Sequence, residues 1–72
     1  MICVITAGPH SHEHFKWDKP APPKEIRMKG PSQQTIAVYS LTDYKRGHYI
    51  FGKCEVQWGD PPLLVEFIEY DE

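Results

Sequence analysis

Three histidines lie close together near the start of the chain, at His10, His12 and His14. In an extended strand alternate residues point to the same side, so these three imidazoles would converge on one face. Three nitrogen ligands with an open fourth position are one way in which proteins hold catalytic zinc. The glycine and prolines around the segment favour a loop instead. The spacing therefore leaves two interpretations, a metal site or exposed histidines with no metal-binding function.

No other group of residues has the spacing of an active site. Cys3 and Cys54 lie in apolar, strand-like runs, where a thiol is buried and inert, and they show neither metal-type nor redox-type spacing. Glu66 and Glu69 would point to opposite faces of a strand. The sequence has no phosphate-binding loop, dinucleotide fingerprint or nucleophile elbow. We therefore expect a non-enzymatic protein with reduced cysteines and no cofactor.

Aromatic side chains are the stronger functional signal, because a chain of 72 residues has room for few of them in its core. A domain of this size buries only about 60% of its unfolded surface. We expect surface rings among Phe15, Trp17, Tyr44, Tyr49, Phe51 and Tyr70. Aromatic anchors with basic neighbours are typical of protein interfaces. The sequence thus predicts a partner-binding surface made of Phe15, Lys16, Trp17, Lys19, Lys24 and Arg27.

Two other interpretations of these residues stay open. Phe15 and Trp17 could fold back to cover the open end of the core, as a small cluster under a long loop. The rings could also stack on the bases of single-stranded nucleic acid, while the lysines neutralise its phosphates. The acidic second half of the chain makes nucleic acid an unlikely direct ligand.

The segments that position these residues are predicted to be strands. The longest runs from His48 to Trp58 and has two faces at period two. Its predicted core face consists of Ile50, Gly52, Cys54, Val56 and Trp58. Glycine is costly inside a strand, so Gly52 indicates a bulge or a close approach by another backbone or a large ring.

Shorter alternating runs flank this strand. Residues 2–7, 24–29, 34–41 and 63–70 have strand composition, and the turn at 30–33 joins the middle two into a hairpin. A short helix at 24–29 is the competing interpretation. Residues 8–23 hold four of the seven prolines and three of the four histidines, which predicts a long and flexible loop. The expected fold is a single domain, 1–72, that is mostly β: a small antiparallel meander or half-barrel of four to five strands.

The charge is divided unevenly along the chain. The formal net charge is −2, yet residues 1–36 carry +2 and residues 37–72 carry −4. Residues 60–72 contain five acids and no base, so they would attract basic partners. The start of the chain lacks a basic leader, and its apolar run is too short for a signal peptide or a membrane span. We expect a cytoplasmic protein with no membrane partner.

In size and type, over residues 1–72, the chain resembles the very small proteins with which lytic phages take over host machinery. The features that carry this likeness are a single domain, surface aromatic residues and no active site. It looks most like those that bind bacterial RNA polymerase. The resemblance implies a transcription regulator that binds the large polymerase subunits, blocks or displaces the σ factor and alters termination. The alternatives are a small metal-binding protein that uses His10, His12 and His14, and an acidic inhibitor of a host defence nuclease that acts through residues 60–72.

Overall fold

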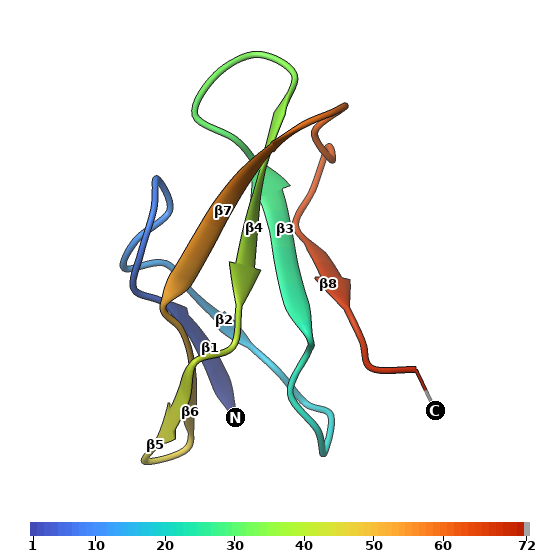
Figure 1. The fold of residues 1–72 in the computed structure, drawn as a ribbon. Coiled ribbons are helices and arrows are strands. Elements are labelled where there is room, and N and C mark those ends of the chain that lie inside the picture. Colours follow the sequence, from blue (N-terminus) through green and yellow to red (C-terminus); the bar gives the residue numbers. More distant parts are fainter. Residues whose placement is uncertain (72) are drawn as a thin grey trace.

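The computed structural model describes residues 1–71, which form eight short strands and no helix. The strands make two four-stranded sheets, shown together in Figure 1. The expected mostly-β class is therefore confirmed, although the strands are more numerous than the four or five expected. Three of them have only three residues, which is too short to show an alternating pattern in the sequence. Within this range no helical segment has the length and hydropathy needed to span a bilayer.

The first sheet has the strand order β2-β1-β6-β5. Its strands are β1 (Ile2–Ile5), β2 (His14–Lys16), β5 (Asp43–Lys45) and β6 (His48–Phe51). The central pair, β1 and β6, is parallel, while the two outer pairs are antiparallel. A parallel pair cannot be closed by a tight turn. The chain therefore makes a long excursion between β1 and β6, which includes β2, two strands of the second sheet (Glu25–Lys29 and Thr35–Ser40) and β5, while the other two strands of the second sheet follow β6.

The second sheet has the order β7-β4-β3-β8, and all its pairs are antiparallel. Its strands are β3 (Glu25–Lys29), β4 (Thr35–Ser40), β7 (Lys53–Trp58) and β8 (Glu66–Ile68). The predicted hairpin is confirmed, since β3 pairs with β4. Ile26 and Met28 point to the buried side of β3, as their alternation predicts. The competing helix at 24–29 is wrong.

The core lies between the two sheets. The fully buried side chains from β1 and β6 are Cys3, Ile5 and Phe51, and those from the second sheet are Ile26, Ala37 and Tyr39. Trp17 and Tyr49 complete the cluster at its margin. Both cysteines are free thiols, and they belong to different sheets.

The prediction of one continuous strand from His48 to Trp58 is wrong, because the segment forms two strands, β6 and β7. The chain leaves the first sheet at Gly52 and enters the second as β7. This break shifts the alternation by one residue, so Tyr49 and Phe51 face the core instead of Ile50. A Cβ at Gly52 would lie 2.8 Å from Oγ1 of Thr42, whose hydroxyl accepts a hydrogen bond from the Gly52 amide. Gly52 thus marks a close approach, but by the threonine side chains of Thr42 and Thr6 and not by the backbone or large ring that was predicted.

Two other boundaries differ from the predictions. The segment 8–23 is interrupted by β2, which pairs with β1 at the edge of the first sheet. The final strand is limited to Glu66–Ile68, so Leu63 and Leu64 lie in the β7–β8 loop. In Figure 1 this loop lies at the end of the molecule opposite to the β5–β6 hairpin.

Candidate protein-binding surface

Phe15 and Trp17 form a closed corner of the core. Phe15 comes from β2 and Trp17 follows directly after it. Both rings pack against Phe67 of β8, with centroid distances of 5.8 Å and 5.1 Å respectively. Trp17 is only 7% exposed, and its indole Nε1 donates a hydrogen bond to the Ala21 carbonyl at 2.7 Å. The prediction of Trp17 as an exposed anchor is wrong, and the interpretation in which these rings cover the core matches their burial.

Two more rings expected on the surface are also buried. Tyr49 is 8% exposed and Phe51 is completely buried, because the break at Gly52 turns both toward the core. Tyr44 stays exposed and stacks on Tyr49 with a centroid distance of 5.0 Å. Tyr70 is exposed as well. The core therefore contains more aromatic side chains than we expected for a chain of 72 residues.

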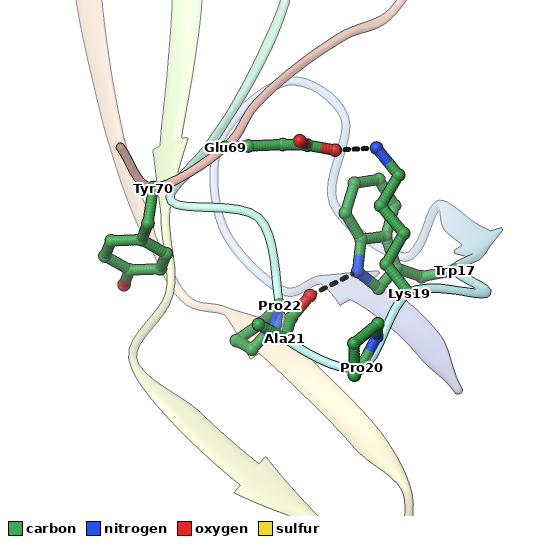
Figure 2. Close-up of a pocket in the computed structure, with 7 residues that line it drawn as sticks. All are labelled: Trp17, Lys19, Pro20, Ala21, Pro22, Glu69 and Tyr70. Atoms are coloured by element: carbon green, nitrogen blue, oxygen red, sulfur yellow. Dashed lines mark hydrogen bonds and ion pairs between the residues drawn. The ribbon is translucent and has the colours of Figure 1, made fainter. Parts of the chain in front are cut away.

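A hollow of about 230 Å³ lies beside the closed corner. Figure 2 shows its lining residues, which are Trp17, Lys19, Pro20, Ala21, Pro22, Glu69 and Tyr70. Lys19 extends along the Trp17 ring, with its ammonium 5.4 Å from the ring centroid, and forms an ion pair with Glu69. The two side chains of this ion pair line the hollow and stay about half exposed.

The basic residues of the predicted surface come from different elements of the fold. Lys16, Lys19 and Lys24 are exposed. Arg27 lies in β3 between the inward-facing Ile26 and Met28, so its side chain points away from the core. It is engaged locally, with its guanidinium 3.3 Å from the Glu25 carboxylate. Arg27 therefore points away from the core, whereas Trp17 packs into it.

The three histidines do not converge. His10 and His12 lie in a turn, where His12 has a φ of 76°, and only His14 belongs to a strand. Among residues 1–71 no group of three histidine, cysteine, aspartate or glutamate side chains has the geometry of a metal site. The zinc interpretation depends on an extended segment over these three histidines, and that prediction is therefore wrong.

His10 fastens the turn to the second sheet. Its Nε2 lies 2.8 Å from the Lys29 carbonyl, and its Nδ1 lies 2.5 Å from Oε2 of Glu13. These two contacts and the turn itself hold the His10 ring between the Glu13 carboxylate and the end of β3. The backbone N–H of His10 also donates to the Tyr39 hydroxyl at 3.1 Å. Both ring nitrogens of His10 are therefore engaged by groups of the protein itself.

The most exposed apolar side chains lie at the open end of the second sheet. Leu63 is 101% exposed and Leu64 is 82% exposed, and both follow Pro61 and Pro62 in the β7–β8 loop. We call these two leucines the apolar tip. The prolines fix two φ angles and so limit the freedom that the tip loses on binding. Beside the tip lies a second hollow of about 250 Å³, lined by the tip together with His10, Met28, Lys29, Pro62 and Val65.

Acidic groups flank the apolar tip in the sequence. Asp60 precedes the two prolines and Glu66 begins β8, and both are exposed. The segment 60–71 carries no base. Lys29, which lines the hollow beside the tip, is the exposed basic residue in that lining.

The apolar tip was missed by the sequence analysis because Leu63 and Leu64 were assigned to a final alternating strand. The signal that could have identified it is Asp60-Pro61-Pro62 directly before the leucines. Two prolines in succession cannot donate ladder hydrogen bonds and hold the chain in an extended turn. Comparison of the chain with protein-family models, with curated proteins and with solved structures finds no match.

Proposed function

We propose that this chain is a non-enzymatic protein-binding regulator whose contact is the apolar tip. The observation that supports the proposal most is the near-complete exposure of Leu63 and Leu64 on a proline-restrained loop. Isolated exposed leucines are ordinary, but two adjacent ones on a proline-restrained loop offer an apolar contact that loses little conformational freedom on binding. The flanking acids favour a partner with a basic rim.

The proposed partner is bacterial RNA polymerase, bound through its large subunits. This choice rests on the resemblance in size and type to phage host-takeover proteins, and on the absence of a catalytic constellation in the sequence. A protein of this kind would act in the host cytoplasm by occupying a surface that the σ factor or another regulator needs. It would require no metal and no cofactor.

The test is the affinity of the full chain for purified core polymerase, measured by fluorescence anisotropy. We expect binding that weakens with salt, and a loss of about 30-fold or more in a Leu63→Ser/Leu64→Ser variant, which corresponds to about 2 kcal/mol. Tyr44→Ser is the matched control, because it removes an exposed apolar side chain from the β5–β6 hairpin at the opposite end of the molecule.

Two outcomes would overturn the proposal in different ways. No binding to the polymerase would eliminate the partner, and unchanged affinity in the double serine variant would eliminate the apolar tip as the surface. Anionic vesicles serve as a further probe. Binding of the tip to vesicles instead of to the polymerase would replace the protein partner with a membrane.

A further inference from the structure

The four sheet edges of this molecule are unequal. β2, β5 and β8 are edge strands of three residues each, whereas β7 is an edge strand of six. Short edges, prolines, bulges and covering loops are the usual means by which proteins prevent edge-to-edge pairing. β7 contains no proline, and Figure 1 shows it as the outermost strand beside β4.

The backbone of β7 has three residues whose polar groups point away from the sheet. The Gly59 amide donates to the Gln34 carbonyl at 2.9 Å, and these two residues continue the register in which Thr35 lies opposite Trp58. Hydrogen-bonded pairs alternate along an antiparallel ladder. Residues 53, 55, 57 and 59 therefore bond to β4, while the amides and carbonyls of Cys54, Val56 and Trp58 face outward.

Side chains on the same strand are also left uncovered. Cys54, Val56 and Trp58 lie opposite Tyr39, Ala37 and Thr35, so they project from the sheet face that carries the core. Cys54 is covered by Gly8, where a Cβ would come within 2.6 Å of Sγ. Val56 remains 48% exposed and Trp58 82% exposed. Both the hydrogen-bonding edge and the apolar face of this strand are therefore unsatisfied at the same place.

We infer that β7 pairs with β7 of a second copy, antiparallel across a two-fold axis at Val56, to form a continuous eight-stranded sheet. The occupant is a second copy because the strand is complementary to itself in this register. Val56 then lies opposite Val56, and Cys54 lies opposite Trp58. All three outward-facing residues meet outward-facing residues, which gives three hydrogen-bonded pairs.

Neighbouring registers are less favourable. Shifting the axis to residue 55 places Glu55 opposite itself, and like charges directly opposite one another destabilise a sheet. Shifting it to residue 57 leaves only two bonded pairs. With the axis at Val56, Glu55 lies opposite Gln57, and no like charges are directly paired. The dimer edge is separate from the apolar tip, so this inference does not depend on the proposed function.

The first experiment is sedimentation of the full chain from about 1 μM to about 1 mM, a range that brackets weak to moderate self-affinity. We expect the average mass to rise from monomer to dimer and no further. Val56→Lys, which places two ammonium groups together at the axis, should shift the midpoint at least about tenfold, with an unchanged circular dichroism spectrum. A chain that stays monomeric throughout overturns the inference, whether or not β7 pairs with a foreign strand.

The second experiment tests the register by oxidative cross-linking. Residues at a hydrogen-bonded antiparallel pair have Cα atoms about 5.5 Å apart, within the range of a disulfide. Val56→Cys should therefore form a covalent dimer through position 56. Gln57→Cys is the control, because its copies would be diagonal neighbours about 7–8 Å apart. A bridge through native Cys54, or equal bridging by both variants, overturns the register.

Discussion

The two tryptophans of this chain occupy opposite environments. Trp17 is 7% exposed, packs against Phe67 and donates its indole N–H to a carbonyl. Trp58 is 82% exposed although it projects from the core face of β7. One ring has been enclosed by a segment that folds back over it, and the other lies where no covering segment reaches among the described residues. Stability therefore depends on the closed corner, while the open end is available for association.

The largest expected effect is on the free energy of unfolding, which should respond very differently to the loss of each tryptophan. Trp17→Ala should lower the free energy of unfolding by about 3–5 kcal/mol, because it removes a buried ring and leaves a cavity. Trp58→Ala should change it by no more than about 0.5 kcal/mol when measured at a concentration where the chain is monomeric. Urea unfolding followed by circular dichroism measures both. Equal losses would mean that Trp58 is also enclosed and that the comparison between the two ends is wrong.

The covered part of β7 ends near Cys54, which lies against Gly8. Gly8 has a φ of +74° and touches Cys54, whereas Gly47 has a φ of +79° with no heavy atom within 4 Å of a Cβ. Gly47→Ala should cost about 1–2 kcal/mol, the price of a left-handed backbone alone. Gly8→Ala adds overpacking of about 1–3 kcal/mol.

The difference between these alanine variants isolates the contact of Gly8 with Cys54. Thermal denaturation of both variants under the same conditions gives the comparison. If the two losses are the same, Gly8 can move away from Cys54 at little cost, and the closed region ends before β7 begins.

Much of this arrangement followed from local sequence. The alternation at Ile26 and Met28 placed β3 correctly, and the composition of residues 34–41 placed β4. These features depend on neighbours in the chain, which a single sequence displays.

The errors arose where distant segments decide the outcome. The burial of Trp17 requires Phe67, which lies 50 residues away, and nothing near Trp17 indicates that contact. The break at Gly52 depends on Thr42 and on the second sheet. Both leucines of the apolar tip fitted an alternating strand, and only the two preceding prolines argued against it. Exposure is a property of the assembled fold, so local sequence alone placed the buried Trp17 among the surface rings.

A third prediction concerns alkaline pH and tests how dry the closed region is. Burial raises the pKa of the Cys3 thiol to about 11, from 9.0, and that of the Tyr39 hydroxyl to about 12, from 10.0. The folded state holds these protons more tightly than the unfolded state, so stability is complete below about pH 9 and is lost progressively as the pH rises toward 12. Urea midpoints at pH 7, 9 and 10.5 measure the decline. A midpoint that stays constant to pH 10.5 would show that water reaches both groups.

The smallest expected effect lies at the rim of the closed corner, where Lys19 pairs with Glu69 across the hollow. Both side chains are about half exposed, so the pair should contribute less than about 1 kcal/mol and should lose most of that in about 1 M salt. Glu69→Gln removes the ion pair but leaves Lys19 over the Trp17 ring, and Lys19→Met keeps much of the apolar stem while removing both charge contacts. Urea unfolding at low and high salt separates the two contributions. If Glu69→Gln lowers the free energy of unfolding by more than about 2 kcal/mol, the ion pair and not the packing of the rings holds this corner together. The burial of Trp17 would then depend on the Lys19–Glu69 pair beside it.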